Sequence, residues 1–299
     1  MKRLSYFAWF VAGFNLLTIV GGAVVRATES GAGCGRSWPL CQGTVVSGAE
    51  EARRLTELTH RSMSVVAALL VAVLVVLVFR KFGKGTQTRR AVFWAGVTII
   101  VESLLGAWLV LAELVEQNSS IMRAVAVPVH LTNTFLLLAA IALTAWLLGS
   151  GKTISWSGPH RRSLLLGTIG MLLLGVTGGI AALADTLFPA TSVADGIIAD
   201  FASAAHFLTR LRVIHPILAV LLGAYVLSRA LKLKDVVPVQ AQFVAVVVVL
   251  QLFLGLANVV LLTPLSTQLA HLVLADLLWI GWVLLGAAVL SGGKRPVPV

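Results

Sequence analysis

The sequence predicts an all-α integral membrane protein whose eight transmembrane helices form two parallel, pseudo-symmetric four-helix bundles. Three observations predict this: a low content of charged residues, eight long apolar segments, and motifs that recur in the two halves. Of 299 residues, 58% are hydrophobic and only 12% are charged, whereas a soluble domain carries roughly 25% charged residues. So few charges could not cover a soluble protein of this size.

Eight apolar segments are long enough to cross a bilayer, which takes about 20 residues. Helices are expected because lipid cannot satisfy exposed backbone groups, and the segments are too long for barrel strands. The first segment resembles a signal peptide, but its apolar run exceeds the usual length of about 7–15 residues, so we expect it to be retained. The expected spans are 7–25, 57–79, 91–112, 124–148, 163–184, 207–228, 238–262 and 267–290.

Basic and acidic residues alternate between the connections. Lys and Arg gather at the N-terminus and at 80–90, 151–162, 229–234 and 293–295. Most acidic residues fall at 26–56, 113–123, 185–206 and 263–266. Because basic connections tend to stay in the cytoplasm, this alternation predicts that both termini are cytoplasmic. The net charge of +11 then reports topology, and no nucleic-acid partner is expected.

The two halves of the chain repeat their motifs at similar spacing. The matched stretches are 57–60 with 212–215, 102–111 with 251–261, and 128–133 with 268–276. Both copies begin on the same side of the membrane, so the repeat is parallel rather than inverted. We therefore predict an N-terminal bundle over 1–148, a cytoplasmic linker over 149–162 and a C-terminal bundle over 163–299.

Four histidines are expected at one depth in the membrane, near the outer ends of the even-numbered spans: His60, His130, His215 and His271. Ionisable groups within a membrane are costly and are functional candidates by default. Two histidines on facing helices can supply the axial ligands of a haem iron, whereas zinc usually recruits a third or fourth protein ligand. Of the other two, His160 is expected to be solvated, and the role of His206 stays open.

Arginines and glycines near these histidines fit the same hypothesis. The candidate partners for haem propionates are Arg26, Arg61, Arg210 and Arg212. Arginine pairs well with carboxylates, although each side chain could equally be snorkelling to the membrane surface. Small residues would allow a flat macrocycle to approach the helices closely. The glycines considered for this are Gly106, Gly175, Gly178, Gly179 and Gly255.

The halves differ in one acidic residue. Glu57 lies one helical turn before His60 and on the same face, whereas Arg212 occupies the matching position before His215. Glu57 could accept a proton or stabilise positive charge. The alternative is an acid at a helix N-terminus that complements the helix dipole.

The halves also differ in their sulfur content, since the only two cysteines, Cys34 and Cys41, lie in the first outer loop. The outer compartment is oxidising, so a disulfide is plausible, as is thiol–disulfide exchange with a partner. A bridge that closes so short a loop adds little stability, which favours a chemical role over a simple loop staple.

Taken together, "GGAVVRATESGAGCGRSWPLCQG", "ELTHR", "HLTN", "IHP" and "HLVLAD" are similar to the motifs of the haem A synthase family, bacterial relatives of the mitochondrial Cox15 protein. The resemblance extends from the first segment to the eighth. It implies a multi-pass oxidoreductase of the bacterial cell membrane. Such an enzyme oxidises the C8 methyl group of haem O to a formyl group, which gives haem A for cytochrome oxidase.

The resemblance also implies roles for the candidate residues. The substrate haem would lie at His60 and His130, and a haem b cofactor at His215 and His271. Glu57 would take part in the oxidation, and Cys34 and Cys41 would be the cysteine pair of the family's outer loop. Some members have a second cysteine pair in the C-terminal half, which this chain lacks.

The expected partners are haem O, delivered by a haem O synthase, the lipid bilayer, and an electron acceptor or thiol–disulfide partner. A di-haem electron-transfer cytochrome without haem-modifying activity is the alternative. It explains the four histidines but neither Glu57 nor the one-sided cysteine pair. A transporter is a weaker alternative, because inverted halves and broken helices are typical of that class.

Overall fold

The computed structural model describes residues 1–41 and 48–292, and in this part of the chain every regular element is a helix. Eight helical stretches of these described residues are long and apolar enough to cross a membrane, which confirms the predicted class and number of spans. The elements are α1 (Lys2–Ala27), α2 (Ala49–Lys81), α3 (Gln87–Leu111), α4 (Ile121–Ser150), α5 (Arg161–Leu187), α6 (Val193–Phe201), α7 (Phe207–Arg212), α8 (Ile214–Leu233), α9 (Pro238–Val260) and α10 (Leu265–Leu290).

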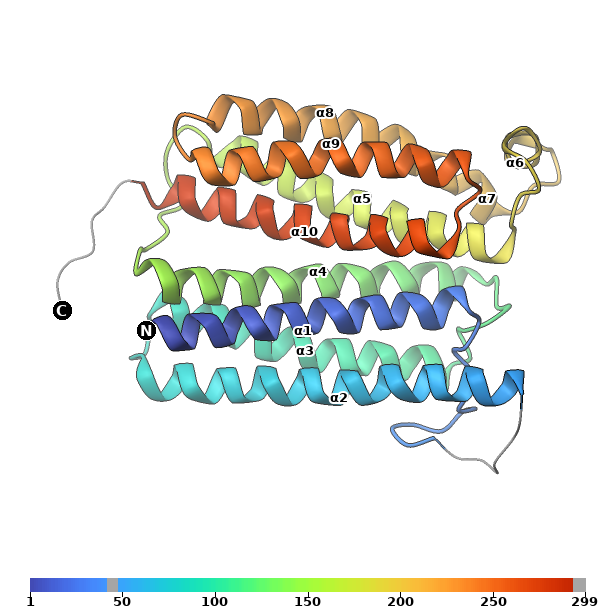
Figure 1. The fold of residues 1–299 in the computed structure, drawn as a ribbon, viewed down its shortest axis with the longest axis horizontal. Coiled ribbons are helices and arrows are strands. Elements are labelled where there is room, and N and C mark those ends of the chain that lie inside the picture. Colours follow the sequence, from blue (N-terminus) through green and yellow to red (C-terminus); the bar gives the residue numbers. More distant parts are fainter. Residues whose placement is uncertain (42–47, 293–299) are drawn as a thin grey trace.

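The long helices form two groups that follow the sequence (Figure 1). In the N-terminal half, α1 and α3 each pack against both α2 and α4. In the C-terminal half, α5 and α9 each pack against both α8 and α10. Both halves therefore have the same order of neighbours, as expected for a repeat of four helices. The pseudo-symmetry axis itself stays a prediction.

The halves meet chiefly through α4, which packs on both α5 and α10. The ring of Trp279 on α10 stacks on Phe135 of α4, with centroids 5.6 Å apart. The indole N–H of Trp279 also donates a hydrogen bond of 2.6 Å to the Phe135 carbonyl oxygen. Both side chains belong to the largest buried apolar cluster, so this contact fixes one half against the other.

The sixth span was expected to be one helix over 207–228, but the structure divides it into α7 and α8 at Val213. Pro216 explains the break, because it has no N–H to bond the carbonyl of Arg212 four residues earlier. A further helix, α6, was not predicted within the connection 185–206. Its first turn is capped by Ser192, whose hydroxyl accepts a hydrogen bond from the N–H of Asp195.

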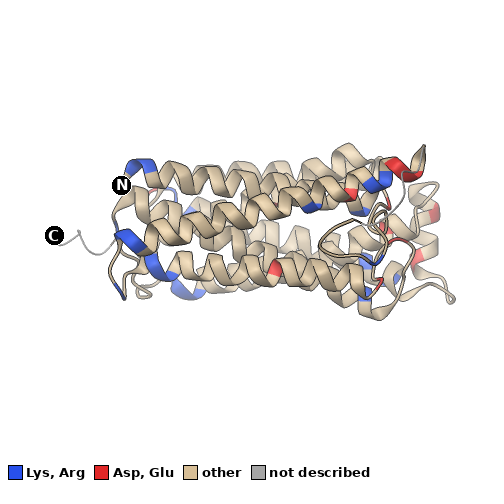
Figure 2. Cartoon of the chain, turned by 90° about the horizontal axis from the view of Figure 1, so that it is seen from below, with Lys and Arg blue, Asp and Glu red and all other residues tan. Residues whose placement is uncertain are grey.

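The two ends of the bundle differ in their acidic residues (Figure 2). We call the end that carries α6, α7 and the Cys34–Cys41 loop the loop end. Acidic residues gather there together with several Lys and Arg, while the opposite end, which includes the N-terminus, carries mainly Lys and Arg. This distribution agrees with the alternation read from the sequence, and the cytoplasmic position of the termini stays a prediction.

Candidate functional site

The structure brings the four predicted histidines together in pairs, one pair within each half. In the C-terminal half, the rings of His215 and His271 lie with centroids 6.4 Å apart and planes at 82°. In the N-terminal half, His60 and His130 lie close enough for an electrostatic interaction between their rings. Each pair joins helices that are not adjacent in sequence, which only the folded bundle can do.

A glycine on a preceding helix makes room for each ring. A Cβ atom at Gly22 would lie 3.0 Å from Cε1 of His60, and one at Gly178 would lie 3.0 Å from Cε1 of His215. The same relationship joins Gly255 to His271 at 3.2 Å and, more loosely, Gly106 to His130 at 4.0 Å. The glycines match between the halves as the histidines do. Gly22 was not among the glycines considered in the sequence, although it occupies the position in the first half that is equivalent to Gly178 in the second.

Three of the four rings have a buried nitrogen whose hydrogen-bonding capacity is unused within the described residues. Within residues 1–41 and 48–292, Nδ1 is buried without a hydrogen-bond partner in His60, His130 and His271, and in His215 it lies 3.3 Å from Oγ1 of Thr177. Buried polar groups are usually paired, so unpaired ones call for an explanation. Two imidazoles per half, cradled by glycines, are a donor set that suits bis-histidine ligation of haem iron.

Glu57 lies between its own helix and the first connection, and only 3% of it is exposed. Its Oε2 accepts a 2.7 Å hydrogen bond from the backbone N–H of Cys34. Its Oε1 accepts one of 3.0 Å from Nε of Arg61 and a second from Nη2. Arg61 in turn donates to the carbonyl oxygen of Ser37 at 2.6 Å. The carboxylate is therefore clamped by the loop and by the arginine one turn along.

Cys34 and Cys41 form a disulfide, with Cα atoms 4.7 Å apart, as one of the sequence alternatives predicted. We call residues 33–41 the disulfide loop. It packs directly onto α2, because a Cβ at Gly33 would lie 2.7 Å from the carbonyl carbon of Arg53. Only a residue without a side chain permits this approach. The loop is thus part of the N-terminal site rather than a separate surface feature.

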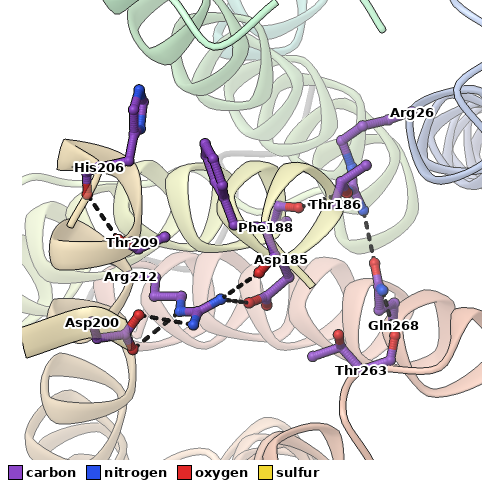
Figure 3. A network of polar contacts seen from close by, with 11 residues as sticks. Arg26, Asp185, Thr186, Phe188, Asp200, His206, Thr209, Arg212, Thr263 and Gln268 are labelled. Atoms are coloured by element: carbon purple, nitrogen blue, oxygen red, sulfur yellow. Dashed lines mark hydrogen bonds and ion pairs between the residues drawn. The ribbon is translucent and has the colours of Figure 1, made fainter. Parts of the chain in front are cut away.

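The candidate arginines all have protein partners. Arg26 extends from α1 to the other half, where it donates to the carbonyl of Ala182 at 2.7 Å, to Thr186, and to Oε1 of Gln268 at 3.0 Å (Figure 3). Arg210 donates to the carbonyl of Ser203 at 2.6 Å.

Arg212 lies between two carboxylates, with Nη1 3.1 Å from Asp185 and Nη2 2.8 Å from Asp200 (Figure 3). It ties α7 to α5 and α6. Any propionate would have to compete with these groups, so the role of the arginines toward haem stays a prediction.

His206, left open by the sequence, begins α7 as its N-cap. Its Nδ1 accepts a 3.3 Å hydrogen bond from the N–H of Leu208, and its ring lies 4.8 Å from that of Phe188 (Figure 3). These contacts give His206 a structural role. His160 precedes α5 at the opposite end of the bundle, away from the paired histidines.

A second acidic residue of the N-terminal site was missed. Glu102 on α3 lies with Oε1 3.5 Å from Nδ1 of His130. Its match in the repeat, Gln251, lies with Nε2 3.1 Å from Nε2 of His271. The alignment of 102–111 with 251–261 contained this signal, because it pairs the two residues, but it did not show that both touch a histidine.

Fold and site together define a multi-pass membrane protein with one histidine pair in each half. A model of the family described as cytochrome oxidase assembly protein, COX15-CtaA, matches residues 5–283. Because the match covers nearly the whole chain, this protein belongs to that family.

Individual relatives carry two different names. The chain is 40% identical over 306 residues to a protohaem IX farnesyltransferase of Thermus thermophilus, covering 99% of this chain and 50% of the relative. It thus spans about half the length of that protein. It is 36% identical over 106 residues to the haem A synthase of Geobacillus thermodenitrificans, covering 36% of this chain and 33% of the relative. The haem A synthase of Lysinibacillus sphaericus is 35% identical over 110 residues, or 36% of each chain.

Proposed function

We propose that this protein is a haem A synthase, which oxidises the C8 methyl group of haem O to a formyl group. Membership of the family and the haem A synthases among its relatives support an enzyme of haem A biosynthesis. The observation that carries the specific proposal is the difference between the halves. One histidine pair lies beside Glu57 and the disulfide loop, whereas the other has Arg212, paired with two aspartates, at the matching place.

In this proposal the N-terminal half is the reaction site and the C-terminal half holds a permanent cofactor. His60 and His130 would bind the iron of haem O, and His215 and His271 that of haem b. The bound haems supply the redox chemistry. The protein contributes orientation through the histidines and the glycines that make room for them. Conversion of methyl to formyl with the oxygen of water releases four protons and four electrons. It therefore requires an external electron acceptor and a proton acceptor near the substrate.

Glu57 is the proposed proton acceptor because it is anchored one turn from His60. In the structure Arg61 and the Cys34 N–H occupy its oxygens. These three hydrogen bonds use three of the four acceptor sites of the carboxylate, so a proton can be accepted at Oε2. The disulfide loop and Arg61 hold the carboxylate in place.

The farnesyltransferase name of the Thermus relatives supports a proposal about substrate supply. That name denotes attachment of a farnesyl group to protohaem, and this chain matches only half of those longer proteins. Haem O is a farnesylated haem, so we propose that a farnesyltransferase of this kind hands its product to this chain. Co-purification of the tagged protein with the haem O synthase of its host tests this, and its absence under mild detergent conditions would contradict direct transfer.

The decisive test of the function is pigment analysis. The chain is produced in cells that make haem O but no haem A, and the haems are extracted and separated. Haem A in the extract supports the proposal. Haem O left unchanged, with haem b bound to the protein, would instead identify the chain as a di-haem electron carrier located in the cell membrane.

A further inference from the structure

Glu102 places a carboxylate against one histidine of the N-terminal half, and the C-terminal half has an amide in its place. We propose that Glu102 is a positioning residue that accepts a hydrogen bond from Nδ1–H of His130 and makes this histidine a more electron-rich ligand than His271. The inference rests on the proposed function, in which His130 binds a haem iron. It concerns a residue that neither the motifs nor the reaction assigned to any role.

The carboxylate of Glu102 is held so that it faces His130. Oε2 accepts a 2.6 Å hydrogen bond from Nδ2 of Asn133, and Oε1 accepts one from the hydroxyl of Thr134. Asn133 is itself fixed, because its Nδ2 also donates to the carbonyl of Thr98 at 2.9 Å. Two side chains of α4, on the turn after His130, thus orient a carboxylate carried by α3.

His130 has a nitrogen that needs such an acceptor. Among the described residues its Nδ1 is buried without a hydrogen-bond partner, and Oε1 of Glu102 lies 3.5 Å away. A small rotation of the ring would bring these atoms to hydrogen-bonding distance. Contacts of this kind are often long without the bound ligand and tighten when it binds.

The C-terminal half repeats the pairing of these two positions without the charge and through the other ring nitrogen. Gln251 occupies the matched position on α9, and its amide nitrogen lies 3.1 Å from Nε2 of His271. A neutral amide can orient an imidazole but cannot increase its negative character. A histidine ligand whose second N–H donates to a carboxylate is the more basic donor. Such a donor favours ferric over ferrous iron, so it lowers the reduction potential of the site.

The reduction potential of the bound haem distinguishes an effect of Glu102 on the His130 ligand from a purely structural contact between α3 and α4. Haem b is loaded into Glu102→Gln in a His215→Ala/His271→Ala background, so that the N-terminal site alone is titrated. We expect haem to be retained and the ferrous-to-ferric ratio at fixed potential to rise about tenfold, which is about 59 mV for one electron. Glu50→Gln, which removes an exposed carboxylate, should cause no shift. An unchanged potential in haem-loaded Glu102→Gln would overturn the proposal.

A second variant, in which the amide of the C-terminal half is replaced by a carboxylate, tests the proposal even if Glu102→Gln does not fold. Gln251→Glu, titrated in a His60→Ala/His130→Ala background, should lower the potential of the C-terminal site. If this variant binds haem b and its potential does not fall, the proposal is wrong even if Glu102→Gln cannot be purified. If the N-terminal site of the otherwise unaltered chain binds no haem while the C-terminal site does, the proposed function fails instead.

Discussion

The backbone N–H of Cys34 donates a 2.7 Å hydrogen bond to the carboxylate of Glu57, which joins the disulfide loop to the acidic residue beside His60. Cys34 is almost completely buried, at 1% exposure, and Glu57 at 3%. The disulfide therefore holds the backbone N–H of Cys34 in a position where it donates to the carboxylate of Glu57. This contact relates the two features that distinguish the N-terminal half, and it leads to predictions for each of them.

Replacement of both Cys34 and Cys41 by serine should reduce haem A formation about 10- to 100-fold, the usual effect of losing a group that orients a site. Without the bridge, the loop no longer holds the Cys34 N–H over Glu57. The fold should persist, because a bridge over so short a loop contributes no more than about 3 kcal/mol. The measurements are the ratio of haem A to haem O in extracted pigments and the melting temperature in detergent. Unaltered activity with intact folding would show that the cysteine pair only shapes the loop and does not affect the reaction.

Glu57→Gln should retain bound haem but lower haem A formation at least about 100-fold, in line with the loss of a general base. The amide keeps the shape of the side chain and can still accept the Cys34 hydrogen bond through its one oxygen, while its NH2 group cannot accept from Arg61. Glu51→Gln is the matched control, because Glu51 lies on the same helix and pairs with an arginine, Arg54. Wild-type turnover in haem-loaded Glu57→Gln would show that the carboxylate is not the proton acceptor.

An exposed ion pair between Arg36 of the disulfide loop and Glu113 predicts a small pH effect. Hydrogen bonds from Arg36 hold the pKa of Glu113 below its ordinary value. A lowered folded-state pKa stabilises the protein above the unfolded pKa, and this stabilisation is lost as pH falls through the folded value. The melting temperature of Glu113→Gln should be slightly below wild type at neutral pH and should converge with it below about pH 4. A constant difference across this range would contradict the assignment.

The number of spans could be predicted because it depends on local composition. The break within the sixth span and the short helix α6 could not be predicted, because they depend on tertiary context. Apolar runs of sufficient length indicated each span. The break at Val213 required attention to Pro216 beside His215, within a segment that reads as continuous by hydropathy. Helix α6 was missed because its nine residues are too few for a strong signal in a connection that also contains Pro189.

The histidine pairs could be predicted from the repeat, but their surroundings could not. Repetition identifies equivalent positions, and it does not reveal which side chains from different helices touch. The contacts of Glu102 with His130 and of Cys34 with Glu57 depend on how α3 meets α4 and how the disulfide loop folds onto α2. Likewise, Arg26 was a candidate for binding a haem propionate, whereas the structure shows its bonds to the other half.

Arg26→Ala should destabilise the contact between the halves. Arg26 is carried by α1, and its guanidinium donates to Ala182, Thr186 and Gln268 on α5 and α10. Loss of hydrogen bonds to a charged group costs about 1.5–3 kcal/mol each before compensation by water, so we expect a clear fall in melting temperature. Arg36→Ala, which removes an exposed arginine, is the control and should have little effect. Equal melting temperatures for the two variants would contradict a bridging role.

Gly178→Ala should impair the C-terminal histidine site and spare the N-terminal one. The added Cβ would lie 3.0 Å from Cε1 of His215, closer than ordinary contact, so the ring must move. Overpacking of this kind costs about 1–3 kcal/mol. Haem content and visible spectra should show loss or altered ligation of the haem that we propose is bound by His215, with the haem proposed for His60 unaffected.

Gly22→Ala should show the reverse pattern, because its Cβ would approach His60 at the same distance, 3.0 Å. Gly13→Ala is the neutral control for both, since a Cβ there meets no atom within 4 Å. Each variant therefore reports on one half of the molecule. If Gly178→Ala and Gly22→Ala altered the same haem spectrum, the glycines would not act through the separate histidine pairs, and the assignment of one haem to each half would be wrong.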